Sequence, residues 1–144
     1  MNQRELGTSG IQVSEIGLGS WQLGAGAWGV RDASECLEII RTALDLGCNF
    51  FDTAPGYAGG HSEEILGRAF KGRREQVVLC TKFGHTAEGG SDFGVNALRP
   101  SLESSLGRLQ TDYVDLLLLH NPPAEMLDGT RTPLYRELEA IDRC

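Results

Sequence analysis

Three apolar stretches of the chain each end in an ionisable side chain. The runs CNFFD, VVLCTK and VDLLLLH are typical of buried strands, and their last residues are Asp52, Lys82 and His120. Tyr57 follows the first of these runs, after a Pro-Gly turn. Neighbouring parallel strands lie about 4.8 Å apart and end at the same edge of their sheet. We therefore expect the four side chains to gather at one edge.

These four residue types can transfer a proton to a carbonyl oxygen. A lysine that points inward needs a counter-charge, so we expect Asp52 and Lys82 to form an ion pair. An ammonium group makes a neighbouring phenol a stronger acid, which marks Tyr57 as a candidate general acid. His120 can donate a hydrogen bond that orients a substrate carbonyl. The sequence thus predicts a catalytic cluster at the strand ends.

Each of these residues also has a structural interpretation. Asp52 can serve in the turn that follows its strand, Lys82 can extend along apolar surface toward water, and His120 can terminate a strand. Tyr57 can pack within a loop. A further alternative makes Lys82 the Schiff-base nucleophile of an aldolase-like site. That chemistry needs a neutral amine, whereas an aspartate partner keeps the amine protonated.

The elements that must position these residues alternate between strand and helix. Asp32 with Glu35 forms a capping-box pattern, which predicts a helix over about 33–46 that Gly47 ends. A second helix is expected after the Pro-Gly turn, with Ser62 as its N-cap. Both segments carry apolar side chains at helical spacing, so each should pack one face against the sheet.

The rest of the chain continues this alternation. Leucines at helical spacing in NALRPSLESSLGRLQ predict a third helix, with Pro100 near its first turn. Thr132 and Pro133 open a fourth helix, and RELGTSGIQVS predicts an N-terminal β-hairpin. Nearly continuous apolar strands that alternate with helices indicate an α/β fold with a covered parallel sheet. We expect residues 1–144 to form a single domain.

Composition narrows the class of partner. The chain carries 13 basic and 20 acidic side chains, a net charge of -7, which disfavours binding to nucleic acid or to an anionic membrane surface. The sequence shows no spanning segment and no export signal. We expect a cytoplasmic protein that acts on small molecules. Its cysteines, expected as reduced thiols, are Cys36, Cys48, Cys80 and Cys144.

Other candidate sites have weaker patterns. His61, His85 and Asp92 match no spacing of metal ligands and fit solvated loop positions, so we propose no metal. The glycines of GLGSWQLGAG do not follow the strand-GxGxxG-helix order of a dinucleotide-binding turn. Trp21 and Trp28 fit a pocket mouth and the core equally well.

Four stretches of the chain together resemble the aldo-keto reductase family. They are GLGSWQLG, FDTAPGYAGGHSEEILGRAF, TKFG and SLGRLQTDYVDLLLLHNP, in family order, and the resemblance covers essentially all of residues 4–123. It implies a parallel (β/α) barrel of TIM type whose bottom is closed by an N-terminal hairpin. It also implies reduction of an aldehyde or ketone by hydride transfer from NADPH, or in some members NADH.

The resemblance also assigns roles to the strand-end residues. They match the family's catalytic tetrad, in which Tyr57 would be the general acid, Lys82 and Asp52 would tune it, and His120 would orient the carbonyl. This assignment agrees with the cluster expected from the residues alone.

The same resemblance implies where the cofactor lies. Ser20 and Trp21 match the strand end that lies beside the nicotinamide half of the cofactor and the substrate in relatives. Asp52 would contact the nicotinamide ribose. Ala58 departs from the glycine that often follows the tyrosine in the family, and this change narrows the allowed backbone angles.

Relatives are much longer than this chain. The resemblance therefore covers only the first four βα units, without the strands that hold the nicotinamide carboxamide or the segment that grips the cofactor phosphate. Open strand edges favour association, so we expect either a homo-oligomer through the barrel edges or a piece of a longer reductase. The alternative function is a binding or regulatory module, because some relatives with this barrel are partners of ion channels.

Overall fold

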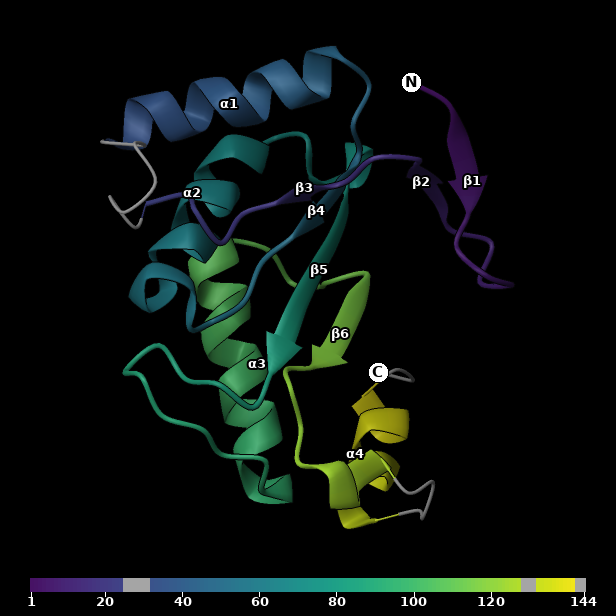
Figure 1. The fold of residues 1–144 in the computed structure, drawn as a ribbon, viewed down its shortest axis with the longest axis vertical. Coiled ribbons are helices and arrows are strands. Elements are labelled where there is room, and N and C mark those ends of the chain that lie inside the picture. Colours follow the sequence, from purple (N-terminus) through teal and green to yellow (C-terminus); the bar gives the residue numbers. More distant parts are fainter. Residues whose placement is uncertain (25–31, 128–131, 142–144) are drawn as a thin grey trace.

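The computed structural model describes residues 1–24, 32–127 and 132–141, which form a hairpin followed by four strand-helix units (Figure 1). The strands are β1 (Gln3–Glu5), β2 (Gln12–Ser14), β3 (Leu18–Gly19), β4 (Phe50–Asp52), β5 (Val78–Phe83) and β6 (Leu116–Leu119). The α-helices are α1 (Ala33–Asp45), α2 (His61–Phe70), α3 (Val95–Leu109) and α4 (Pro133–Ile141). Three short 3-10 helices are η1 (Tyr57–Gly60), η2 (Arg74–Gln76) and η3 (Ala124–Leu127). Within these ranges no helix has the length and apolarity needed to cross a membrane.

The four later strands form one parallel sheet. Their order is β3-β4-β5-β6, so every strand lies beside its neighbour in sequence and the carboxyl ends line up along one edge. The register pairs Asp52 with Gly19 on one side and with Cys80 on the other, and it pairs Lys82 with Leu118. The predicted α/β fold is confirmed, and this sheet supplies the first four strands of a TIM-type barrel.

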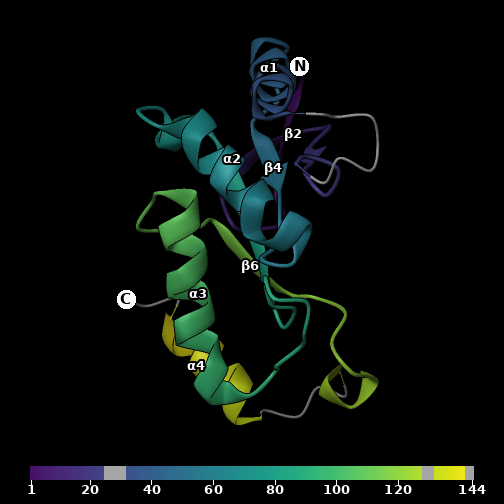
Figure 2. The same ribbon diagram turned by 90° about the vertical axis from the view of Figure 1, so that its left-hand side faces the viewer.

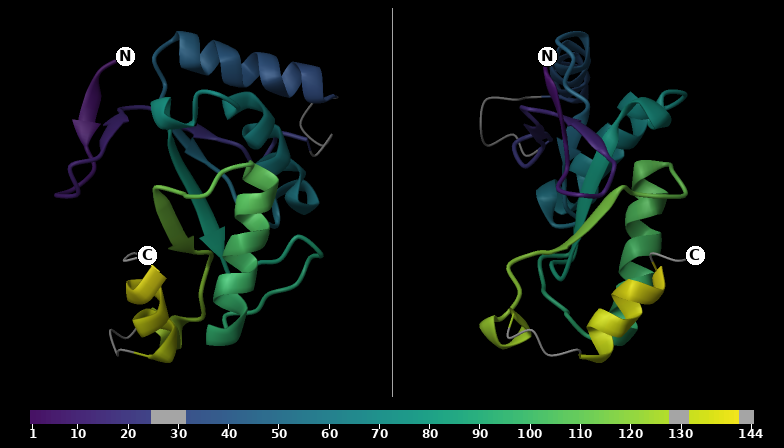
Figure 3. Two further views of the ribbon diagram at one scale, coloured as in Figure 1. Left: turned by 180° about the vertical axis from the view of Figure 1, so that it is seen from behind. Right: turned by 90° about the vertical axis from the view of Figure 1, so that its right-hand side faces the viewer.

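Helices α2 and α3 cover one face of this sheet (Figures 2 and 3). The core beneath the helices includes Phe51, Leu66, Phe70 and Leu79, all buried. The rings of Phe51 and Phe70 meet edge to face with their centroids 4.7 Å apart. The β1-β2 hairpin lies beyond the amino end of β5, so the loops after β5 and β6 remain uncovered by it (Figure 1).

Local signals explain where helices α1 and α4 begin and where α1 ends. Asp32 caps α1 by accepting a hydrogen bond from the Glu35 amide at 2.9 Å. Gly47, with a φ of +85°, follows the end of α1 in the left-handed region that glycine tolerates. At the start of α4 the Thr132 hydroxyl accepts from the Tyr135 amide. These predicted signals are confirmed.

Two predicted helix features were wrong. Ser62 does not cap α2, which begins at His61 and has Gly60 at its N-cap, two residues before the predicted cap. The Ser62 hydroxyl is instead buried and donates to Ser20, because this end of the helix packs directly on the strand ends. Pro100 lies in the second turn of α3 and not near the first, since the helix already starts at Val95.

The sheet has two free edges within the described residues. They belong to β3 and β6, the outer strands of the order given above. Leu118 on β6 is 44% exposed, although it belongs to an unbroken run of leucines. Association through these edges stays a prediction.

A buried carboxylate joins α2, α3 and β5. Glu63 is fully buried and accepts hydrogen bonds from the Thr81 hydroxyl at 2.6 Å and from Arg108 Nε at 2.7 Å. Arg108 also donates to the Ser105 hydroxyl at 3.2 Å. The cation and the hydroxyl together compensate the loss of water around Glu63. This network locks both helices to the strand that carries Lys82.

Helices α2 and α3 approach so closely at Gly67 that no side chain fits there. A Cβ atom on Gly67 would lie 2.6 Å from the Arg108 carbonyl oxygen and 2.7 Å from the Leu109 backbone. Gly107, on α3, has open space around it instead. The two glycines therefore form a matched pair, one at the contact and one away from it.

We predict that Gly67→Ala lowers the free energy of unfolding by about 1–3 kcal/mol, because the added methyl group forces the helices apart. Gly107→Ala should raise it by about 0.5–1 kcal/mol, since alanine is the better helix former. Urea denaturation of both variants measures the difference. A Gly67→Ala variant as stable as Gly107→Ala would contradict the close contact.

Candidate active site

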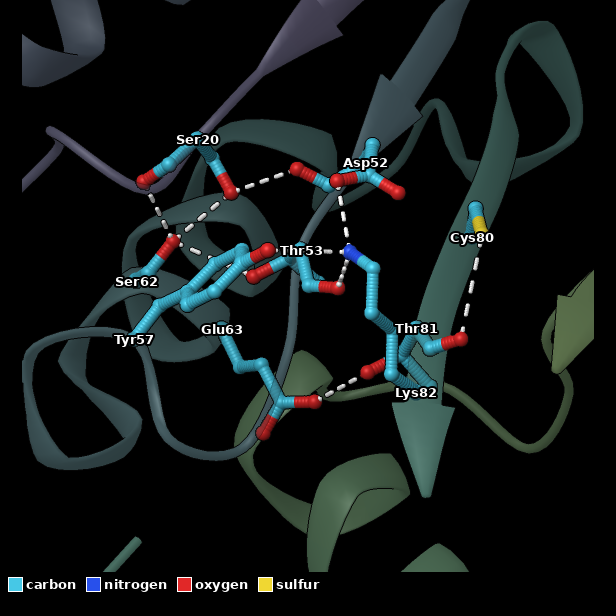
Figure 4. Close-up of polar contacts among 9 residues, drawn as sticks. All are labelled: Ser20, Asp52, Thr53, Tyr57, Ser62, Glu63, Cys80, Thr81 and Lys82. Atoms are coloured by element: carbon cyan, nitrogen blue, oxygen red, sulfur yellow. Dashed lines mark hydrogen bonds and ion pairs between the residues drawn. The ribbon is translucent and has the colours of Figure 1, made fainter. Parts of the chain in front are cut away.

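The Lys82 ammonium group lies at the centre of the site (Figure 4). Its Nζ donates hydrogen bonds to Asp52 Oδ1 at 2.6 Å, to the Thr53 carbonyl oxygen at 2.8 Å and to the Tyr57 hydroxyl at 3.2 Å. An ammonium group has three N–H bonds, so these contacts use all of them. The ion pair expected from the sequence is present, and the Tyr57 hydroxyl contacts its ammonium group.

The strand register brings the charged pair together. Asp52 ends β4 opposite Cys80, and side chains two residues apart on a strand share a face, so Lys82 lies on the Cys80 side. The side chain of Lys82 is 12% exposed and that of Asp52 is 33% exposed. Burial and the Asp52 charge raise the pKa of Cys80 to about 12, so its thiol stays protonated.

Three buried hydroxyl groups hold the strand ends from behind. Ser62 Oγ donates to Ser20 Oγ at 2.8 Å and lies 3.1 Å from Thr53 Oγ1. Ser20 Oγ in turn donates to the Asp52 carbonyl oxygen at 2.8 Å. Figure 4 shows this chain of hydroxyls on the far side of Asp52 from Cys80. The Ser20 hydroxyl is thus turned into the protein, and its place beside a cofactor stays a prediction.

The turn that carries Tyr57 has an unusual backbone. The Tyr57 amide donates to the Ala54 carbonyl oxygen at 3.1 Å, and the next three residues all have positive φ. Gly59 and Gly60 tolerate this conformation, whereas Ala58 adopts a φ of 52° with a Cβ atom present. The sequence predicted that alanine at position 58 has a smaller range of allowed backbone angles than glycine. The angles that Ala58 adopts lie in the left-handed region.

His120 follows β6 and stands between two other rings. Its ring meets that of Tyr57 edge to face at 5.6 Å and that of His85 at 4.7 Å, measured between centroids. The His120 Nδ1 atom is buried and has no hydrogen-bond partner among the described residues. The sequence placed His120 here correctly. His85 and Asp92 lie in the loop after β5 as expected, Asp92 exposed and His85 partly buried against His120, whereas His61 is the first residue of α2 and pairs with Glu64.

The neighbours of the site set its charges. Burial lowers the pKa of Lys82, but the hydrogen bonds and charges of Asp52 and Tyr57 outweigh burial, so this pKa lies above its ordinary value. Burial, followed by the positive charge of Lys82 and the neighbouring imidazole of His85, lowers the pKa of His120. Near neutral pH the site therefore holds a charged amine and a neutral imidazole.

A cavity of about 510 Å³ opens onto Tyr57 and His120, which is a size typical of small-molecule sites. Its other walls include Trp21, His85, Thr86, Gly89, Gly90 and Ser91. Trp21 is 53% exposed and lines the cavity, so of its two interpretations the pocket mouth is correct. Trp28 and Cys144 lie outside the described residues.

Comparison with known proteins identifies the family. A profile described as "Aldo/keto reductase family" matches residues 15–140. The chain belongs to the aldo/keto reductase family. Aldo-keto reductase YhdN of Bacillus subtilis (strain 168) is 44% identical over 127 residues, which are 85% of this chain and 38% of that reductase. The holo structure of aldo-keto reductase AKR11C1 from Bacillus halodurans has 35% identity and a TM-score of 0.86, covering 99% of this chain and 47% of that one.

Other aldo/keto reductase relatives carry names that record different roles. The NADH-specific methylglyoxal reductase of Escherichia coli (strain K12) is 40% identical over 136 residues, 83% of this chain and 42% of its own. A probable voltage-gated potassium channel subunit beta of Oryza sativa subsp. japonica is 38% identical over 147 residues, which cover 99% of this chain and 42% of that subunit. The structure of an aldo/keto reductase from Klebsiella pneumoniae in complex with NADP and acetate has 37% identity and a TM-score of 0.61. The match covers 76% of this chain and 36% of that one. The chain thus spans about two fifths of the length of these curated relatives.

We predict a strong energetic coupling between Asp52 and Lys82. Asp52→Asn should lower the free energy of unfolding by about 1–3 kcal/mol, because it leaves the ammonium with neutral acceptors only. The same change in a Lys82→Met background should cost less, since the cation is gone. A double-mutant cycle by urea denaturation measures the coupling. The exposed Arg4–Glu15 pair, at 2.7 Å, is the control, with a coupling below about 1 kcal/mol; additivity at both pairs would contradict the central role of the ion pair.

We also predict that His120 makes stability depend on pH. Its pKa is lower in the folded chain than the unfolded value of about 6.5, so the unfolded chain takes up the proton first. Stability should therefore be greatest above pH 6.5 and fall as the pH drops through the folded pKa. Replacing His120 by Gln should shrink the loss of stability between pH 7 and pH 5, measured by urea denaturation at both values. Equal losses in the two proteins would rule out this contribution.

Proposed function

We propose that the protein containing this chain reduces aldehydes or ketones to alcohols, with a nicotinamide as hydride donor and Tyr57 as proton donor. The observation that carries the proposal is the 3.2 Å hydrogen bond from Lys82 to the hydroxyl of Tyr57, a residue that lines a cavity together with His120. Membership of the aldo/keto reductase family supports the reaction class. The proposal concerns the whole protein, because the chain spans only part of its relatives.

The hydrogen bonds of Lys82 set the direction in which Tyr57 can give its proton. Lys82 donates to the phenolic oxygen, so the hydroxyl hydrogen of Tyr57 has to point elsewhere. The cavity is the space that offers it an acceptor, namely a substrate carbonyl oxygen. After the proton has moved, the ammonium stabilises the phenolate that remains, while Asp52 keeps the amine charged.

His120 is proposed to orient the carbonyl. Its lowered pKa leaves the ring neutral, so one nitrogen still carries a proton to donate. The ring contacts Tyr57 edge to face, so a carbonyl oxygen that meets the phenol lies within reach of the imidazole. A neutral donor there polarises the carbonyl without adding a second positive charge beside Lys82.

The cofactor is proposed to be NADPH, with NADH as the alternative. When bound, the nicotinamide supplies the hydride that reaches the carbonyl carbon. The residues proposed to lie beside it are Trp21, Ser20 and Asp52, at the ends of β3 and β4. Trp21 is half exposed at the cavity and can offer a flat apolar surface to a ring, which fits such a group. The relatives named above include one described as NADH-specific and one bound to NADP, so both forms stay in the proposal.

The remaining proposals concern partners and location. A small carbonyl compound is the proposed partner, with no role for nucleic acid or membrane. Cytoplasmic location and association through the free edges of β3 and β6 are also part of the proposal, the edges being open within the described residues.

A second candidate is a binding or regulatory module, which the potassium-channel relative favours. Titration with NADPH separates the two functions, because a catalytic protein has to bind the cofactor saturably.

An aldolase-like Schiff base is disfavoured, since the Lys82 amine has a raised pKa and stays protonated.

We predict that Tyr57→Phe lowers kcat by about 10²–10⁴-fold, because it removes the proton donor and leaves the ring in place. The affinity for NADPH should stay unchanged. Oxidation of NADPH with 4-nitrobenzaldehyde measures turnover, and Tyr113→Phe is the control, because Tyr113 packs against Arg74 away from the site. Equal rates for Tyr57→Phe and the unmodified protein would remove Tyr57 from the mechanism.

A further inference from the structure

A second imidazole lines the cavity, and the reaction proposed above does not use it. The His85 ring touches the His120 ring at 4.7 Å between centroids, nearly perpendicular at 81°. Both rings line the 510 Å³ cavity together with Tyr57. Neither ring nitrogen of His85 makes a hydrogen bond within the described part of the chain. A polar ring at a substrate cavity therefore keeps its hydrogen-bonding capacity for a ligand.

The loop that carries His85 is built to hold the ring in place. His85 pairs with Ser91 in an antiparallel bridge, and the Thr86 amide donates to the Gly90 carbonyl oxygen at 2.9 Å. Just before the bridge, Gly84 adopts a φ of +121°, and a Cβ atom there would lie 2.1 Å from the Phe93 ring. Only glycine fits this position, so the chain enters the loop along one path.

Packing fixes the ring from two further sides. Phe93 meets His85 edge to face at 6.3 Å, and Phe93 also contacts Phe83 at the end of β5 at 6.0 Å. Beside the turn that carries Tyr57, a Cβ atom on Gly56 would lie 3.6 Å from the Cβ of His85. Because the ring is held between His120 and Phe93, its position relative to Tyr57 is largely set before any ligand binds.

We propose that His85 is a specificity residue that hydrogen-bonds a hydroxyl group on the carbon next to the reacting carbonyl. The inference rests on the proposed function, in which His120 and Tyr57 hold the carbonyl oxygen. Two imidazole rings in contact can reach oxygens on adjacent carbons of one small molecule. A 2-hydroxy ketone or 2-hydroxy aldehyde satisfies both rings, whereas a substrate without the hydroxyl offers the His85 nitrogens no hydrogen-bond partner.

A matched pair of ketones tests the proposal. Hydroxyacetone and 2-butanone differ only by a hydroxyl in place of a methyl group on the carbon beside the carbonyl. The protein that contains this chain should favour hydroxyacetone by about tenfold in kcat/KM, the effect of one good hydrogen bond. Equal kcat/KM values for the two ketones would overturn the proposal.

Two variants of His85 separate recognition from packing. His85→Phe keeps an aromatic ring against His120 and Phe93 but cannot hydrogen-bond, so it should lower kcat/KM for hydroxyacetone about tenfold more than kcat/KM for 2-butanone and thereby abolish the preference. His85→Gln restores a donor and an acceptor and should recover part of the preference. If His85→Phe lowers kcat/KM equally for both ketones, His85 acts through His120 and not on the substrate, and the proposal fails.

A binding measurement keeps this inference distinct from the proposed function. Titration with each ketone, followed through the imidazole NMR signals of the unmodified protein, should shift the His85 signals with hydroxyacetone and not with 2-butanone. Such a shift in a protein that turns over neither these ketones nor 4-nitrobenzaldehyde would support the His85 contact and overturn the reductase proposal. Turnover of both ketones with no selective His85 shift would overturn the contact alone.

Discussion

The structure of the site depends on keeping one charged amine stable in a place with little water. Lys82 reaches this state because each of its three N–H bonds finds an oxygen, and the three oxygens come from Asp52, Thr53 and Tyr57. A slip of one residue in the β4-β5 register would turn the amine to the other face of the sheet. The same interaction that charges the site therefore also fixes its register and the path of the following turn.

Helix α2 supports this arrangement through its first turn. Ser62 joins the ends of β3 and β4 through hydroxyl contacts, and the next residue, Glu63, reaches Thr81 on β5 and Arg108 on α3. Two consecutive residues thus hold three strands and a second helix. The close contact at Gly67 keeps that second helix in position. The polar groups of the site are consequently mounted on elements whose mutual positions are set by buried hydrogen bonds.

The sequence predicted those features that depend on short-range patterns. The strand ends at Asp52, Lys82 and His120 could be read because apolar runs stop there, and the hairpin, the cap at Asp32 and the parallel sheet follow from local rules. It could not place Ser62, since a serine before two glutamates is also a typical helix cap and only the packing of the helix on Ser20 decides between these roles. It likewise missed the Glu63–Arg108 pair and the contact of His85 with His120, because both depend on segments far apart in sequence.

Ala58 gives the turn beside Tyr57 a particular kind of order. Its methyl group makes the left-handed backbone costly by about 1–2 kcal/mol relative to a residue without a Cβ atom. Glycine in its place would relieve that cost but would open many backbone wells to the unfolded chain and to the turn itself. With alanine, the backbone next to Tyr57 has few conformations available. Its conformational entropy is therefore lost when the chain folds and not when a substrate binds.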